Sequence, residues 1–337
     1  MRIRILFLTA AILGLISLGL YLQWTQDRRA GPLLSDLRPL TIEHQGSNRG
    51  LGNLLAIEVR LLPADYQSPE RLHLRFASHL RQAQDAGLLG SQTVVALPEH
   101  VGTGLFAIGE KPEVQQARTL RDAMQWMALS NPLGYLRALL GNHGEDRRTE
   151  AVLRMKARGT AAAYQSVFAD LAREFEVTLV AGSLVLPEPY LSNGRLRPGS
   201  GPLRQVAAVF SPEGTILEPL LIKHHLSRYE QRYSAASHVA RWYAEYETPA
   251  GSLTVMLGCD DPRQESERPA VAALIGSDCA PLPGAQHQVQ VGTLGLPWNL
   301  AGSPRRPNPV VNAQPGRMLN AWIGKDHNSV ASSASSE

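Results

Sequence analysis

The chain has 337 residues, and 33 lysines and arginines against 30 aspartates and glutamates give a formal net charge of only +3. Hydrophobic residues make up 44% of the chain and charged residues 19%, which suffices for a full core and excludes wholesale disorder. So small a charge excess, with no block of five like charges, argues against nucleic acid as a partner. Two cysteines are too few for a disulfide scaffold, and no Cys/His spacing typical of zinc occurs.

An uncharged run from Ile5 to Trp24 stands at the N-terminus, preceded by Arg2 and Arg4. About 20 helical residues span the roughly 30 Å hydrocarbon core of a bilayer. No convincing small-x-small cleavage site follows the run, which favours an uncleaved single-pass anchor over a secretory signal. Residues 1–29 are therefore predicted to be a membrane anchor. Arginines flank both ends, so the charges only weakly favour an extracytoplasmic position for the rest of the chain.

The segment after the anchor, residues 30–50, carries Pro, Gly, Ser and Asn without a clear period and is predicted to be a linker. A strand is predicted over 53–61, a helix begins at Ser68-Pro69, and a second strand covers 92–97. This order is typical of a βαβ unit. The nearly continuous apolar strands indicate a sheet that is covered on its faces.

The apolar pattern of the next part of the chain predicts an inserted helical hairpin over residues 112–147 and then a long helix from about Thr149 to Phe175. Pro269 to Ile275 predicts the start of another helix. Five strands are predicted between these helices, at residues 177–185, 205–210, 215–222, 242–247 and 252–258.

The composition changes towards the C-terminus. Residues 281–315 hold seven of the chain's 23 prolines, and residues 328–337 are mostly Ser and Ala. The tail 281–337 is predicted to be partly disordered and to contribute no set of central strands. The main domain is accordingly assigned to residues 51–280.

Three strand ends carry reactive side chains: Glu99, Lys223 and Cys259. Open α/β sheets place their sites at the carboxyl ends of strands, so these three residues are expected to converge. An ammonium group lowers the pKa of a nearby thiol, and a carboxylate can accept the thiol proton and pass it on. A lysine can also stabilise the oxyanion of a tetrahedral intermediate.

Each of these residues also has an ordinary structural interpretation. Glu99 and Lys223 would then be solvated charges at turns, and Cys259 an inert buried thiol. In an oxidising compartment Cys259 and Cys279 could form a disulfide, which would occupy the nucleophile. The adjacent pair His224-His225 points to opposite faces of a strand and is a poor metal site.

The sequences around the three residues resemble the signature regions of the nitrilase, or carbon–nitrogen hydrolase, superfamily. The segments are VVALPEHVGTG, LLIKHHLSRYE and GSLTVMLGCDD, in the family's order. NLLAIEVR, LVAGSLVL and VAAVFSPEGTI resemble further strands of the family, so the likeness covers roughly residues 52–275. The resemblance implies an α/β fold of the four-layer α-β-β-α sandwich type.

The resemblance also implies roles for individual residues. Glu99 would be the general base and acid, Lys223 would stabilise the oxyanion, and Cys259 would be the nucleophile. Glu230 matches a second, supporting glutamate, and the backbone N–H of Asp260 would donate to the oxyanion. The implied reaction is hydrolysis of a non-peptide C–N bond in a small amide through a thioester, and it calls for no metal or organic cofactor. Nitrile hydrolysis and N-acyl transfer by the same triad stay open, as does a homo-oligomeric state.

Two departures from the family pattern support a different interpretation. Asp260 follows Cys259 directly, where the family usually has an aromatic or small residue before its aspartate. LIGSDCAPLPGAQHQ stands where the family continues with a hydrophobic strand. The alternative is therefore a degenerate, non-catalytic member tethered to the membrane.

Overall fold

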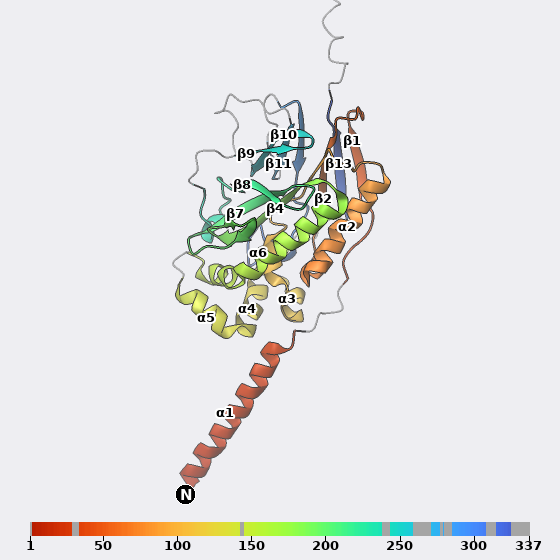
Figure 1. Cartoon of the computed structure of the whole chain (residues 1–337). Coiled ribbons are helices and arrows are strands. Elements are labelled where there is room, and N and C mark those ends of the chain that lie inside the picture. The colour runs from red at the N-terminus through yellow and green to blue at the C-terminus, as the bar shows by residue number, and fades with distance from the viewer. Residues whose placement is uncertain are drawn as a thin grey trace, which may run out of the picture.

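The computed structural model describes residues 2–28, 34–141, 145–237, 243–258, 271–276, 279, 285–307 and 315–324. A long helix, α1 (Arg2–Gln26), projects from one end of a body that is built around two β-sheets (Figure 1). Its 25 residues are apolar enough to cross a membrane, and none of them is buried.

The larger sheet has seven strands in the order β1-β13-β2-β3-β4-β7-β8. The central neighbours β2, β3 and β4 run parallel, whereas β7 pairs antiparallel with β4 and β8 pairs antiparallel with β7. The strands are β1 (Thr41–Gln45), β2 (Asn53–Val59), β3 (Thr93–Ala96), β4 (Thr178–Pro187), β7 (Leu203–Phe210), β8 (Ile216–Ile222) and β13 (Gly316–Trp322).

The smaller sheet has four strands in the order β12-β11-β10-β9. Apolar side chains of both sheets, such as Ala96 and Val180 from one and Val255 and Ile275 from the other, form a single buried cluster. The two sheets therefore pack face to face. The strands are β9 (Tyr243–Thr248), β10 (Gly251–Leu257), β11 (Val271–Ile275) and β12 (His287–Val291), and β5 (Tyr190–Ser192) and β6 (Arg195–Arg197) form a separate hairpin.

Helices α2 (Pro69–Asp85) and α6 (Arg147–Phe175) cover the other face of the larger sheet (Figure 1). Ser68 caps α2 as predicted, because its side chain accepts a hydrogen bond from the N–H of Arg71. Phe168 of α6 packs its ring against Phe76 of α2 and Phe210 of β7. This layer forms the main hydrophobic core.

The predicted helical insert is present as three short helices, α3 (Pro112–Gln116), α4 (Leu120–Ser130) and α5 (Pro132–Leu140). The first half of the predicted hairpin is interrupted at Thr119, whose side chain caps α4 by accepting a hydrogen bond from the N–H of Asp122. Single 3-10 turns are η1 (Pro63–Tyr66), η2 (Thr103–Ala107), η3 (Glu230–Arg232) and η5 (Pro297–Asn299).

The α/β architecture and the paired sheets agree with the predicted sandwich, and three of its four layers lie within the described residues. The outer face of the smaller sheet carries a cluster that includes Met256, Leu274 and Cys279, and no described residue forms a helix over it. The helix predicted to begin over 269–275 is wrong for its described part, because Val271–Ile275 is strand β11. β11 pairs with β10 in parallel.

The tail, predicted to contribute no set of central strands, supplies one strand to each sheet. β12 extends the smaller sheet, and β13 lies inside the larger one, between β1 and β2. The linker predicted over 30–50 likewise contains β1, which pairs with β13. The domain limits 51–280 are therefore too narrow, and the ground for the degenerate alternative is weakened.

Trp298 shows why the proline-rich tail belongs to the core. Its side chain is fully buried, and its indole N–H donates to the carbonyl of Val114 (3.0 Å). The indole ring lies 5.5 Å from the ring of Phe106 and 6.4 Å from that of Tyr66, measured between centroids. Truncation of such a buried aromatic side chain to alanine costs roughly 3–5 kcal/mol of folding free energy. Trp298 therefore contributes substantially to the stability of the fold.

Candidate active site

Glu99 stands three residues beyond the end of β3, at the carboxyl edge of the parallel strands. The N–H of Leu97 still donates to the carbonyl of Val180 on β4 (2.9 Å), so the turn remains attached to the sheet. At Gly182 the register of β4 shifts, and a Cβ there would collide with the carbonyl oxygen of Pro98. Only glycine lets the two backbones approach so closely at φ +65°.

Lys223 follows the end of β8, where its N–H donates to the carbonyl of Gln205 on β7 (2.9 Å). Its ammonium nitrogen lies 2.5 Å from Glu99 Oε1 and 3.0 Å from Glu230 Oε1. The Lys223 and Glu230 side chains are buried, and that of Glu99 is 14% exposed. The structure thus brings together three of the five predicted site residues.

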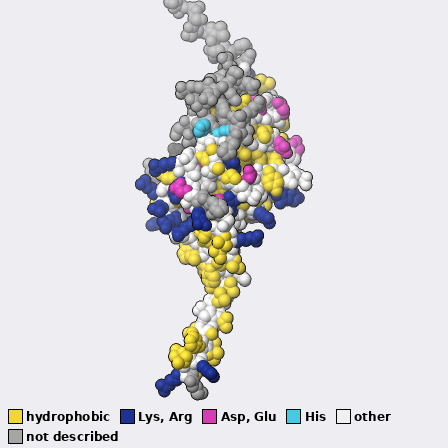
Figure 2. Space-filling model, turned by 90° about the vertical axis from the view of Figure 1, so that its left-hand side faces the viewer, with side chains coloured by type: hydrophobic (Ala, Val, Ile, Leu, Met, Phe, Trp, Pro, Cys, Tyr) yellow, Lys and Arg dark blue, Asp and Glu magenta, His cyan; other side chains and the backbone are white. Residues whose placement is uncertain are grey.

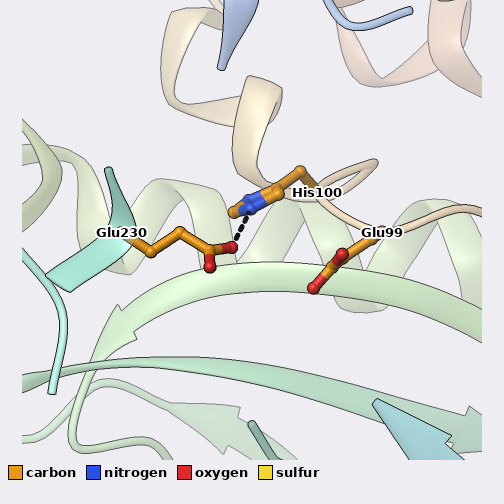
Figure 3. Close-up of side chains that lie close together, drawn as sticks. All are labelled: Glu99, His100 and Glu230. Carbon is orange, nitrogen blue, oxygen red and sulfur yellow. Dashed lines mark hydrogen bonds and ion pairs between the residues drawn. The ribbon is translucent and has the colours of Figure 1, made fainter. Parts of the chain in front are cut away.

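His100 is a member of this cluster that the sequence reasoning did not single out. It has a left-handed backbone conformation, φ +62°, which is uncommon for histidine. Its N–H donates to Ser183 Oγ (2.8 Å), and its Nε2 lies 2.7 Å from Glu230 Oε1 (Figure 3). The available signal was its place directly after Glu99 at a strand end.

Gln205 on β7 supports Glu99 from the opposite side. Its amide Nε2 donates to Glu99 Oε1 (2.7 Å) and to Ser183 Oγ (2.9 Å). Ser183 therefore accepts hydrogen bonds from both Gln205 and His100. Glu99 is fixed by an amide and an ammonium group together, which leaves little rotational freedom to its carboxylate.

The charges of the cluster shift the pKa values of its members. Burial by itself would lower the pKa of Lys223, but the carboxylates of Glu99 and Glu230 outweigh it and raise that pKa above its ordinary value. Burial by itself would raise the pKa of Glu230. The hydrogen bond and charge of His100, together with the charge of Lys223, outweigh it and lower that pKa to about 2.

Glu99, His100 and Glu230 each offer a ligand atom within 4.8 Å of the others, which is close enough for a metal ion. Figure 3 shows these three side chains from two separate segments of the chain. However, the ammonium of Lys223 contacts both carboxylates, at 2.5 and 3.0 Å. A metal ion would have to share them with this fixed positive charge, so the arrangement favours Lys223 as the cation of the site.

Cys259 and Asp260, the remaining predicted site residues, lie outside the described residues. The described part of the chain leads to their position through β10 and Gly258. A Cβ on Gly258 would lie 3.1 Å from Lys223 Cε, so this glycine is in contact with the lysine side chain. Its φ is +89°, and its N–H donates to the carbonyl of Ile275 (2.8 Å), which continues the pairing of β10 with β11 to this residue.

Cys279 is disulfide-bonded and not a free thiol. It is buried on the outer face of the smaller sheet, beside Leu274. The sequence contains two cysteines in total, and the other is Cys259. The oxidised alternative raised by the sequence therefore has to be included in any test of a cysteine nucleophile.

No protein-family model and no curated protein matches the chain. Among solved structures, it is similar to an amidase from Nesterenkonia sp., with 11% identity, a TM-score of 0.44, and coverage of 87% of this chain and 92% of that one. A carbon–nitrogen hydrolase from Helicobacter pylori has 17% identity and a TM-score of 0.37, over 67% of this chain and 60% of that one. A mutant of the Nesterenkonia AN1 amidase, described as a member of the nitrilase superfamily, has 13% identity and a TM-score of 0.36, over 66% and 64%.

Proposed function

We propose that the protein is a membrane-anchored carbon–nitrogen hydrolase of the nitrilase type, which hydrolyses a non-peptide C–N bond in a small amide. The observation that carries this proposal is the buried contact of Lys223 with Glu99, at 2.5 Å, at the point where β10 delivers Gly258. The next residue in the chain is Cys259. The proposal adds the thiol of Cys259, which follows this strand end in the sequence, to the carboxylate and the ammonium.

The proposed reaction has two stages. Glu99 accepts the thiol proton of Cys259 as the sulfur bonds to the amide carbon, and the resulting oxyanion is stabilised by Lys223 and by the N–H of Asp260. Glu99 then gives the proton to the leaving nitrogen as the C–N bond breaks and a thioester remains. Water, deprotonated by Glu99, attacks the thioester and releases the acid, and the proton returns to the thiol.

Glu230, His100 and Gln205 are positioning residues in this scheme. Glu230 holds the ammonium of Lys223 through both of its oxygens, at 3.0 and 3.1 Å. His100 holds Glu230, and Gln205 holds Glu99. The network keeps the base and the cation in place before a substrate enters. Such preorganisation lowers the barrier of the reaction.

The proposed mechanism requires Cys259 in its reduced form, so activity is expected to depend on reductant. The body is proposed to lie outside the cytoplasm, in line with the weak preference of the terminal amine for the cytoplasmic side. The α1 helix would then be the single-pass anchor. Nitrile hydrolysis and N-acyl transfer remain alternatives, because they would use the same three residues.

The test is turnover of a panel of small amides and nitriles by the full chain, reduced with a thiol reagent and assayed for ammonia. Cys259→Ala, Glu99→Gln and Lys223→Met are each expected to lower kcat by at least about 100-fold, since each removes a participant in the transition state. Lys111→Met is the matched control, because Lys111 is also a buried lysine (2% exposed) but lies outside the cluster. Equal rates for wild type and Cys259→Ala would contradict the proposal. An acyl acceptor that replaces water as the better second substrate would favour the transferase alternative.

A further inference from the structure

The end of α1 is docked on the helical insert. The hydroxyl of Tyr21 donates to the carbonyl of Leu129 on α4 (2.7 Å). The ring of Trp24 lies 6.3 Å from that of Trp126, and the ammonium of Lys111 lies 4.3 Å from the Trp24 ring centroid. The insert is therefore fixed at the end of the body from which α1 extends (Figure 1).

Arg28, two residues after α1, fixes the same junction. Its guanidinium donates to the carbonyl of Ser130 (3.1 Å) and to Asn131 Oδ1 (2.7 Å), and it pairs with the buried Glu110 (2.9 Å). Charged residues and aromatic rings that follow an apolar span mark the membrane–water interface. The turn between α4 and α5 is thus held at the level of that interface if α1 spans the bilayer.

The outer side of this turn is apolar and uncovered. On α5, Leu133, Leu136 and Leu140 lie at i, i+3 and i+7, on one face of the helix, and are 82%, 53% and 74% exposed. Leu129 and Trp126 of α4 are 53% and 37% exposed. Such a group of exposed large apolar side chains is unusual on a surface that meets only water.

Arginines lie between the same helices. A cavity of about 540 Å³ between α4, α5 and α6 is lined by Arg121, Arg148 and Arg305, over apolar side chains such as Leu139. Within the described residues, no carboxylate is paired with any of these three arginines. The carboxylate in the cavity lining, Asp146, is paired with Arg232 (3.2 Å). Figure 2 shows Lys and Arg side chains gathered around the end of the body that joins α1.

We propose that the outer face of α4 and α5 rests on the bilayer surface, with its leucines among the acyl chains and Arg121, Arg148 and Arg305 on the phosphates of anionic lipids. A face that combines apolar side chains and arginines is typical of helices that lie in the membrane interface. The inference rests on the anchor assigned to α1 in the proposed function, and is independent of the proposed chemistry. The occupant is lipid, because this face continues directly from the docked end of α1.

The test uses the full chain, one copy in each lipid nanodisc, in discs of phosphatidylcholine alone or with one third phosphatidylglycerol. Hydrogen exchange of the peptide that covers 132–140 reports whether α5 is covered. Exchange is expected to slow in the anionic discs, by roughly fivefold for each arginine that engages the surface. Inorganic phosphate added to the phosphatidylcholine discs should not reproduce this protection. If it does, the arginines form a site for a soluble anion and the proposal is wrong.

The apolar part is tested by Leu136→Glu, with Leu51→Glu as the matched control. Both leucines are 53% exposed, and Leu51 lies two residues before β2, outside α1 and the helical insert. Leu136→Glu should raise the exchange of α5 several-fold in both kinds of disc, and Leu51→Glu should not. Arg121→Gln combined with Arg305→Gln should reduce the effect of anionic lipid to what Arg148 alone supplies, and should leave exchange in the phosphatidylcholine discs unchanged.

A second measurement does not depend on the stability of α5. Quenching of tryptophan fluorescence by spin-labelled lipid, compared between wild type and Trp126→Phe, isolates the depth of Trp126. Efficient quenching of Trp126 is expected. Absence of quenching, or protection of α5 only in discs that hold two copies, would overturn the proposal; the latter would assign this face to a second copy of the chain. Recovery of the protein in the discs tests separately whether α1 enters the bilayer.

Discussion

Lys223 is held between two carboxylates, at 2.5 Å from Glu99 and 3.0 Å from Glu230. Because all three side chains are largely buried, their charges interact in a medium of low polarity and depend strongly on one another. Removing either carboxylate leaves the other to hold a buried ammonium alone. The consequences should be visible in stability as well as in activity.

Glu230 is the residue whose contribution to stability should depend most clearly on pH. Its pKa is lowered to about 2 in the folded protein, from an ordinary value near 4.5, so it binds its proton less readily than in the unfolded chain. The stabilisation is complete above about pH 4.5 and is lost as pH falls towards 2. The difference in Tm between wild type and Glu230→Gln should be constant from pH 6 to 8 and shrink below pH 4.5.

Glu247→Gln is the control for the loss of one negative charge, because Glu247 is exposed. A Tm difference between wild type and Glu230→Gln that stays the same from pH 7 to 3 would contradict the ion pair with Lys223.

Gly182 and Gly194 allow the position of Glu99 to be tested by a matched pair of alanine substitutions. Their φ values are +65° and +68°, so alanine costs about 1–2 kcal/mol of backbone strain at either site. Around Gly194 nothing lies within 4 Å of an added Cβ, whereas at Gly182 the Cβ collides with the carbonyl oxygen of Pro98. Gly182→Ala should displace Glu99 and lower kcat by about 100-fold.

Gly194→Ala should leave kcat within about twofold of wild type. Its Tm should fall only by the amount that corresponds to the backbone strain. Equal loss of kcat in the two alanine variants, measured at a temperature where both are folded, would show that the bulge in β4 does not position Glu99.

At the scale of elements, β13 is the part of the tail that completes the larger sheet. It pairs with β1 on one side and β2 on the other, and its Met318 is fully buried. A chain that ends at residue 324 keeps β13 and should have the Tm of the full chain. A chain that ends at residue 314 loses the strand and exposes the edge of β2.

Loss of Met318 burial alone costs about 2–5 kcal/mol, against a total stability of about 5–15 kcal/mol. The shorter truncation product should therefore be insoluble or unfolded by circular dichroism. A cooperative thermal transition within about 5 °C of the full chain would show that β13 is dispensable.

The central strands of the larger sheet and the helices that cover it could be predicted from their own residues. β2 and β3 are continuous apolar runs, and α2 has its serine cap and a 3–4 residue period. β1, with the polar sequence TIEHQ, and β13 have no such signal. They pair mainly with each other and with β2, so their structure depends on contacts that are distant in sequence.

The site shows the same division. Glu99, Lys223 and Glu230 could be predicted from strand ends and from the family motifs. His100 and Gln205 could not, because their contacts depend on the bulge at Gly182 and on the pairing of β4 with β7. Neither feature has a periodic signal in the sequence.

At the scale of the whole molecule, the proposed role of α1 as a membrane anchor can be tested on the mature protein. The apolar helix should remain part of the mature protein, so the chain purified from membranes should have the intact mass that includes residues 2–26. Alkaline carbonate should leave it in the membrane pellet, and deletion of residues 2–26 should release it. A mature mass lacking this segment would identify it as a cleaved signal sequence instead.

The proposed mechanism requires that Cys259 forms a thioester with a small acyl group. The most direct measurement is intact mass of the reduced full chain after brief incubation with amides, followed by acid quench and peptide mapping. The mechanism predicts an added mass equal to that of the acyl group less one hydrogen, located on the peptide that contains Cys259, absent in Cys259→Ala and longer-lived in Glu99→Gln if acylation still occurs. Reduced protein that turns over an amide without any adduct on Cys259, or a rate unchanged in Cys259→Ala, would contradict it.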